Sequence, residues 1–140
     1  MSPRNITLNL IDEVRALPDI SFIDLDAPMS RNIPGHYTGS ASWGDNKSSP
    51  RYLVVPEFAW TDKELLVWLH ELGHLRTLRR GRAIKNDRDW WNVEVLAWRW
   101  ARATLGERWT PEMARIARLY LNSYKKYFKE RAFLKRKGWL

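Results

Sequence analysis

The chain has 140 residues, 44% of them hydrophobic, which suits one domain with a core of its own. It contains no cysteine, and this excludes disulfides, a cysteine nucleophile and thiolate metal ligands. The first twenty residues lack the continuous apolar core of a signal peptide, and no apolar run reaches the length of a membrane span. We therefore expect a single cytoplasmic domain over residues 1–140 that makes no contact with a membrane.

The net charge of +8 is concentrated in the second half of the chain. Residues 111–140 carry 9 Lys/Arg and 2 Asp/Glu, a charge of +7, whereas residues 1–70 carry 6 Lys/Arg and 9 Asp/Glu, a charge of −3. Such an asymmetry indicates either an anionic partner or a solvated helix face. A weak contact with nucleic acid through the basic C-terminal half is one expectation that follows.

The first half of the chain predicts one helix and three short strands. An amphipathic pattern predicts a helix over residues 6–17, which Pro18 stops. Alternating apolar residues between turn signals predict strands at residues 20–25, 36–43 and 51–58. Pro56 indicates that the last of these lies at a sheet edge or ends there.

The second half predicts three helices. The sequence TDKE, from Thr61 to Glu64, is a capping box that starts the first of them, and its apolar side carries Leu65, Leu69, Leu72 and Leu75. A basic turn followed by Gly81 ends this helix. Asp89 is expected to cap a second helix that ends before Gly106. Thr110-Pro111-Glu112 begins the third, a basic C-terminal helix over about residues 111–137.

These elements together predict an α+β fold. A small antiparallel or mixed sheet is expected to pack on the helix that begins after Thr61, and two further helices follow it.

The sequence HELGH, residues 70–74, is the strongest functional motif. His70 and His74 are four residues apart on a predicted helix, so their imidazoles project from the same face and can bind one metal ion. Zinc suits nitrogen ligands in tetrahedral geometry. Glu71 projects beside the metal rather than onto it, where it can accept a proton from an activated water. Gly73 costs about 1 kcal/mol in a helix relative to Ala, and its small size predicts that a neighbouring element approaches closely.

A catalytic zinc needs a third protein ligand. LRTLRRG follows the second histidine and offers no third one, so the extended metzincin pattern fails, whereas the gluzincin pattern would take a Glu from the next helix. Glu94 stands 20 positions after His74 among apolar residues, where a carboxylate is costly to bury unless it binds a cation. The alternatives are that Asp87 or Asp89 is the ligand, or that Glu94 pairs with a nearby arginine such as Arg88 or Arg99.

LLVWLHELGH followed by EVLAWRWARATL resembles the ImmA/IrrE family of gluzincin-like zinc metallopeptidases. The matches are the strand residues 52–55, the HELGH helix at 70–74, and Glu94 with Ala97 and Trp98, and they cover about residues 35–105. The resemblance implies a minimal zincin-like fold, zinc held by His70, His74 and Glu94, and hydrolysis of a peptide bond. It also implies a protein substrate such as a DNA-bound transcriptional repressor, often in a phage or other mobile element.

Other residues have weaker claims to a role at this site. The strand at 51–58, or the one at 36–43, would align a peptide by strand addition. The tetrahedral intermediate of hydrolysis needs a hydrogen-bond donor, and the candidates for this or for substrate binding are His36, Tyr37, Tyr120 and Tyr124. Five of the nine tryptophans lie within residues 90–109, where packing between helices explains them more simply than stacking on nucleobases.

Two functions from different classes remain open from the sequence. The first is a zinc metalloendopeptidase in which Glu71 is the general base. The second is a basic module that binds nucleic acid or protein and keeps a zinc ion only for stability. Glu71 favours the first, because a structural zinc site gains nothing from a base beside it.

Overall fold

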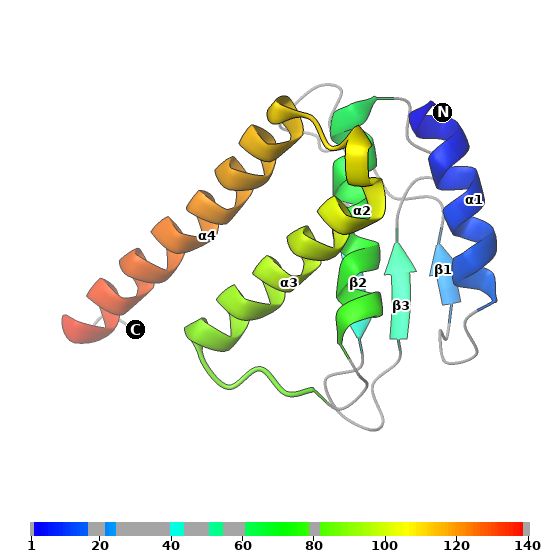
Figure 1. The fold of residues 1–140 in the computed structure, drawn as a ribbon. Coiled ribbons are helices and arrows are strands. Elements are labelled where there is room, and N and C mark those ends of the chain that lie inside the picture. Colours follow the sequence, from blue (N-terminus) through cyan, green and yellow to red (C-terminus); the bar gives the residue numbers. More distant parts are fainter. Residues whose placement is uncertain are drawn as a thin grey trace.

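The computed structural model describes residues 2–16, 22–24, 40–43, 51–54, 61–78 and 82–138. These residues form helices and short strands, shown in Figure 1. The helices are α1 (Pro3–Arg15), α2 (Asp62–Thr77), α3 (Asp87–Leu105) and α4 (Pro111–Arg136), with a 3-10 turn, η1 (Gly106–Arg108), between the last two. The strands are β1 (Phe22–Asp24), β2 (Ser40–Trp43) and β3 (Arg51–Val54).

The predicted α+β class is wrong, because helices dominate the described chain. Among the residues whose side chains are also described, 84% are helical and 2% lie in strands. The strands hold only 3, 4 and 4 residues, and the helices hold 13, 16, 19 and 26. A strand of four residues presents two side chains to each face, too few to cover a helix. The apolar area is therefore buried mainly between helices, and the fold is a helical one.

The short strands lie in the order β1-β3-β2, with β1 parallel and β2 antiparallel to β3. Of the two alternatives that Pro56 indicated, the edge position is wrong, because β3 pairs on both sides, whereas the end of the strand agrees with β3 stopping at Val54. Strand addition to β3 is therefore excluded, whereas β2 has one pairing side open among the described strands. His36 and Tyr37 lie outside the described residues. The buried Arg51 donates a hydrogen bond to the carbonyl of Leu75 and so ties β3 to the end of α2.

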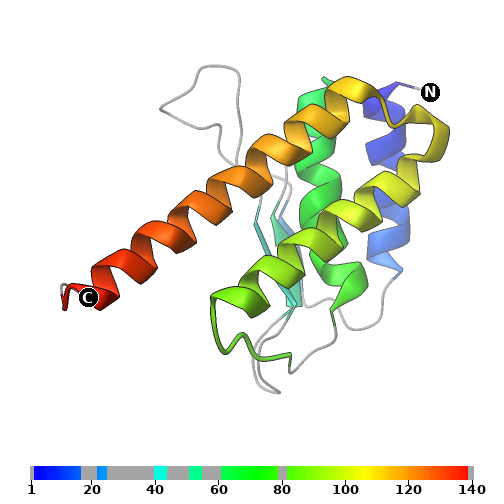
Figure 2. The same ribbon diagram turned by 60° about the vertical axis from the view of Figure 1, so that its left-hand side comes forward.

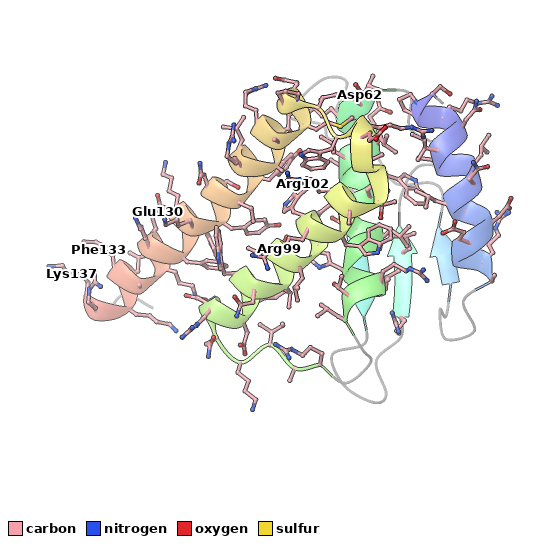
Figure 3. All side chains as sticks on the ribbon, viewed as in Figure 1. Asp62, Arg99, Arg102, Glu130, Phe133 and Lys137 are labelled. Carbon is pink, nitrogen blue, oxygen red and sulfur yellow. The ribbon has the colours of Figure 1, made fainter. Side chains whose placement is uncertain are left out.

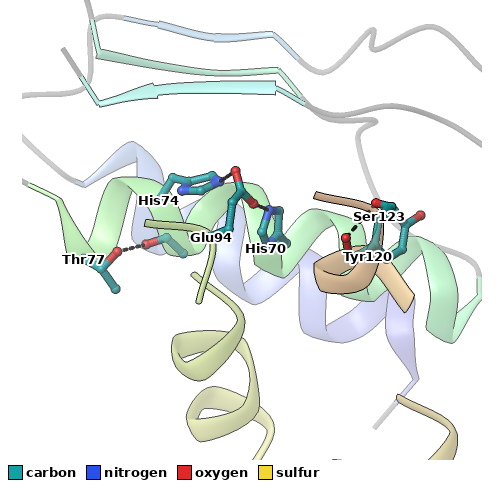
Figure 4. A network of polar contacts seen from close by, with 7 residues as sticks. His70, His74, Thr77, Glu94, Tyr120 and Ser123 are labelled. Atoms are coloured by element: carbon teal, nitrogen blue, oxygen red, sulfur yellow. Dashed lines mark hydrogen bonds and ion pairs between the residues drawn. The ribbon is translucent and has the colours of Figure 1, made fainter. Parts of the chain in front are cut away.

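Helix α2 is the central element of the fold. Thr61 caps it as predicted, its hydroxyl accepting a hydrogen bond from the backbone N–H of Glu64 at 3.2 Å. The prediction of one apolar side is too narrow, since Leu66 and Trp68 are fully buried as well. A helix buried nearly all round lies inside a domain rather than on its surface. Figure 4 shows the strands on one side of α2 and α3 on the other.

The ends of α3 differ from the prediction at one point. Asn86, not Asp89, caps the helix by accepting a hydrogen bond from the N–H of Asp89 at 2.9 Å. The carboxylate of Asp89 in turn accepts a hydrogen bond from the N–H of Lys85, the residue before the cap, and so helps to fix the start of the helix. Gly106 ends the helix as predicted, with φ of 56°, a conformation that favours glycine.

Helix α4 extends beyond the core. Thr110 caps it by accepting a hydrogen bond from the N–H of Met113 at 3.1 Å, and Pro111 occupies its first turn. Met113 and Ala117, both near its start, are its buried residues. Figures 1 and 2 show the rest of the helix running out past α3 towards the C-terminus. Phe133, in this outer part of the helix, is 44% exposed.

The hydrophobic core lies around α2, between α1, α3, the start of α4 and β3. Its side chains are almost all aliphatic, with Trp68 and Trp98 as the large exceptions. None of the helices among the described residues is both long and apolar enough to cross a membrane.

Candidate metal centre

The two histidines of the HELGH motif lie on one face of α2, as their spacing requires. Their rings are 4.7 Å apart between centroids and meet edge to face. His70 is 6% exposed and His74 is 4% exposed. Two imidazoles buried side by side each need a polar partner, because each carries nitrogens that water no longer reaches.

A partner comes from α3, which packs closely against α2 at Gly73. A Cβ atom placed on Gly73 would lie 2.7 Å from the backbone oxygen of Ala97 and 3.0 Å from its Cα. Real Cβ atoms do not come so near, so the two helices can pack in this way only with glycine at residue 73. The close approach expected from the sequence is thus observed, and it occurs one helical turn from Glu94.

Glu94 lies between the two histidines (Figure 4). Its Oε2 is 2.7 Å from Nε2 of His70, and its Oε1 is 3.5 Å from Nε2 of His74. Glu94 is 4% exposed, and one ligand atom from each of the three residues falls within 4.8 Å of the others. The three residues named from the sequence as metal ligands are therefore gathered at one point.

The donor set fits zinc. Two imidazole nitrogens and one carboxylate oxygen at bond lengths of about 2.0–2.2 Å would be about 3.3 Å apart in a tetrahedral site. In the structure each imidazole Nε2 faces a different carboxylate oxygen, that of His70 at 2.7 Å from Oε2 and that of His74 at 3.5 Å from Oε1, so both separations are near that value. Oε2 of Glu94 is buried, and its close neighbour is Nε2 of His70 at 2.7 Å, with which it makes no well-aligned hydrogen bond. A cation between the three side chains would satisfy this oxygen.

The ionisation of the two glutamates is also suited to such a site. Burial alone would raise the pKa of Glu94, but its interactions with His70 and His74 outweigh burial and lower the pKa to about 2. Glu94 is therefore an anion, the state in which a carboxylate binds a metal. Burial raises the pKa of Glu71, while the charges of His70 and His74 lower it and that of Glu94 raises it. Glu71 thus lies within electrostatic reach of all three candidate ligands without belonging to their cluster.

Trp98 supports His70 from α3. The two rings are 4.4 Å apart between centroids and inclined by 32°, and Trp98 also packs on Tyr120 at 5.6 Å. Trp98 is 5% exposed and lies one turn after Glu94, so the helix that supplies the carboxylate also fixes the plane of the imidazole. The sequence motif included Trp98 but gave no reason to place it under His70.

The remaining candidates fall in different places. Asp89 is used in capping and Asp87 lies 3.5 Å from Arg131 of α4, so neither belongs to the cluster of ligands. Glu94 contacts the histidines and has no ion pair with Arg88 or Arg99.

Of the two described tyrosines proposed as donors, Tyr124 lines a cavity with Glu94, while Tyr120 packs against Trp98. Burial, and then the carboxylates of Glu94 and Glu71, raise the pKa of Tyr124 above its usual range. Its hydroxyl therefore remains a hydrogen-bond donor.

The chain matches no protein-family model, no curated protein and no solved structure. The resemblance to the ImmA/IrrE peptidases thus rests on the sequence motifs alone.

Proposed function

We propose that this protein is a zinc-dependent metallopeptidase that hydrolyses a peptide bond in a protein substrate. The observation that carries the proposal is the convergence of His70, His74 and Glu94 from two helices, with Glu71 beside them. Three protein ligands leave a tetrahedral ion one position for water or substrate, which is the mark of a catalytic rather than a structural zinc site.

The roles of the residues follow from their positions. A bound zinc ion would supply Lewis acidity, polarising the scissile carbonyl and lowering the pKa of water towards about 7. The carboxylate of Glu71 accepts the proton of the attacking water and then donates it to the leaving amine. Partial burial suits this double role, because it raises the pKa of Glu71 above that of an exposed glutamate.

Tyr124 is the described residue best placed to stabilise the tetrahedral intermediate. It lines the same cavity as Glu94 and feels the charges of both glutamates, so it lies near the reacting centre. Its hydroxyl stays protonated and can donate a hydrogen bond to the developing oxyanion. We therefore assign it this role in preference to Tyr120, whose ring packs on Trp98.

A DNA-bound transcriptional repressor is the substrate class that the resemblance to ImmA/IrrE peptidases suggests. The rival function, a basic binding module with a structural zinc, is supported by the charge of +7 over residues 111–140, from 9 Lys/Arg and 2 Asp/Glu. Glu71 separates the two functions, because only hydrolysis needs a proton acceptor beside the ligands.

The test compares two isosteric variants, Glu71→Gln and Glu94→Gln, in zinc content, thermal stability and cleavage of an unstructured protein substrate. Glu71→Gln should keep about one zinc per chain and its melting temperature, and should lose at least about 100-fold in cleavage rate. Glu94→Gln removes a ligand, so it should lose zinc affinity as well. If the wild-type protein holds zinc but Glu71→Gln changes no activity, the peptidase proposal fails and the rival is favoured.

A further inference from the structure

A groove between α3 and α4 leads away from the metal centre. Its inner part is a cavity of about 650 Å³ that has Glu94 in its lining and is walled mainly by aromatic side chains: Trp90 of α3, and Tyr124, Tyr127 and Phe128 of α4. The α4 residues 124, 127, 128, 131 and 135 are spaced so that they share one face of the helix. We refer to this feature as the α3–α4 groove.

The outer part of the groove is a second cavity, of about 460 Å³, which shares Trp90 and Arg131 with the first. Its charged lining consists of four cations and one carboxylate: Lys85, Arg88, Arg131, Lys135 and Asp87. The single carboxylate, Asp87, is 3.5 Å from Arg131, and both side chains are partly exposed. The groove is therefore apolar next to the metal centre and cationic farther out.

The rise of the two helices gives the distance along the groove between the metal centre and the cations. Tyr124 lies beside Glu94, and Arg131 lies beside Asp87, so seven residues of each antiparallel helix, about 10 Å, separate the metal centre from the cations. An extended peptide covers that distance with about three residues. Within the groove, Phe128 is followed on the same face by Arg131 and Lys135, which are displaced by about 4.5 and 10 Å along the axis.

From this arrangement we propose that the α3–α4 groove binds an extended substrate peptide with a bulky apolar side chain in the aromatic part and an acidic side chain two residues farther along. Side chains two positions apart in an extended chain point to the same side and are about 7 Å apart. That spacing lies between the axial displacements of Arg131 and Lys135 from Phe128, about 4.5 and 10 Å. The inference rests on the proposed peptidase function, because that function requires one end of the bound peptide to reach the metal centre.

The charge pattern favours a peptide over the other occupants. A nucleic acid presents phosphates at every nucleotide, but the inner end of the groove holds Glu94, with Glu71 close by, and both would repel them. A second copy of α4 would bring the same excess of 9 Lys/Arg over 2 Asp/Glu within residues 111–140 and would be repelled by the cations. A peptide with one apolar and one acidic side chain would avoid both repulsions, because its apolar end lies near the glutamates and its acidic side chain lies near the cations. Trp90 and Tyr127, which are 39% and 54% exposed, would be covered by it.

The experiment measures binding of short fluorescein-labelled peptides to the full chain carrying Glu71→Gln, by anisotropy, with and without zinc. The peptides contain one phenylalanine and one aspartate, and the aspartate is moved one position at a time away from the phenylalanine. We expect the tightest binding when the two are two positions apart, and at least tenfold weaker binding when asparagine replaces the aspartate.

Matched variants of α4 test the location. The double variant Arg131→Glu with Lys135→Glu should abolish the preference for aspartate. The control, Lys126→Glu with Lys129→Glu, makes the same change of charge at exposed positions on the opposite face and should keep it. Phe128→Ala should weaken binding, whereas Phe133→Ala should not, because Figure 3 shows Phe133 on the side of α4 that faces away from α3.

The possible failures of the two proposals are distinguishable. If wild-type protein cleaves peptides with no preference for an acidic residue, the groove proposal is wrong and the peptidase proposal stands. If the peptides bind as expected but are never cleaved, the peptidase proposal is wrong and the groove proposal stands. Tighter binding of a single-stranded oligonucleotide than of any peptide, lost with Arg131→Glu and Lys135→Glu, would overturn the groove proposal. Self-association that Phe128→Ala abolishes would also overturn it.

Discussion

Gly73→Ala should damage the metal centre more than it damages the fold. The added Cβ would lie 2.7 Å from the backbone oxygen of Ala97, whereas ordinary contact begins at 3.4 Å, so α2 and α3 must separate locally by about 0.7 Å. Overpacking of this kind costs about 1–3 kcal/mol, and the higher helix propensity of alanine returns about 1 kcal/mol. The net loss of stability should therefore be between about 0 and 2 kcal/mol.

The same displacement is large for a metal site. Ligand distances tolerate only about ±0.2 Å, and Glu94 is on α3 while both histidines are on α2. We expect zinc affinity to fall at least tenfold, measured by competition with a chromophoric chelator. Because the added Cβ collides with the backbone of Ala97, adding Ala97→Gly to Gly73→Ala should not restore zinc affinity.

Gly106→Ala is the matched control. Its φ is 56° and no atom lies within 4 Å of an added Cβ, so alanine there is strained but meets no neighbour. The strain should cost about 1–3 kcal/mol of stability and leave zinc affinity unchanged. If Gly73→Ala folds and binds zinc as tightly as Gly106→Ala does, the close approach of the helices does not set the geometry of the ligands.

Three further outcomes are expected. Trp98→Phe should retain most of the stability that Trp98→Ala loses, about 3–5 kcal/mol by chemical denaturation, because a ring stays under His70. Tyr124→Phe should leave zinc content unchanged and lower kcat about 100-fold in a cleavage assay, since only the donor hydroxyl is lost. In the metal-free protein, the pKa of Glu94 is lowered from 4.5 to about 2. The contribution of Glu94 to the free energy of unfolding is therefore fully present above about pH 4.5 and is lost as the pH falls towards 2. Urea unfolding between pH 6 and 3 should show this loss, at most a few kcal/mol, and Glu94→Gln should remove it.

The convergence of the candidate metal ligands could be predicted from the sequence because its signals are local. Two histidines four residues apart share a helix face whatever the rest of the chain does. Glu94 stood out because a carboxylate among apolar residues needs a partner, and its buried position between His70 and His74 agrees with that reasoning. The glycine within the helix carried information too, since the cost of Gly73 predicted the close packing that is observed.

The fold class could not be predicted from the same kind of signal. Alternating residues marked the three strands, but their lengths of 3, 4 and 4 residues depend on pairing that the pattern does not contain. The central position of β3 and the burial of α2 on nearly every side depend on which elements meet in space. The capping of α3 by Asn86 instead of Asp89 is a choice between neighbouring residues of similar propensity.

The two faces of α3 explain how one helix can contribute both to the candidate metal centre and to the proposed peptide groove. Towards α2 it presents the backbone at Ala97, and the absence of a side chain at Gly73 brings the helices close enough for Glu94 to reach both histidines. Towards α4 it presents Trp90, and large aromatic residues there keep the helices apart over a cavity of about 650 Å³. Because Glu94 is also in the lining of that cavity, a peptide lying in the groove would meet the metal centre at its inner end. If both proposals hold, a change that brought α3 and α4 together would obstruct the peptide and leave the three candidate ligands in place. A change between α2 and α3 would displace the candidate ligands and leave the groove open.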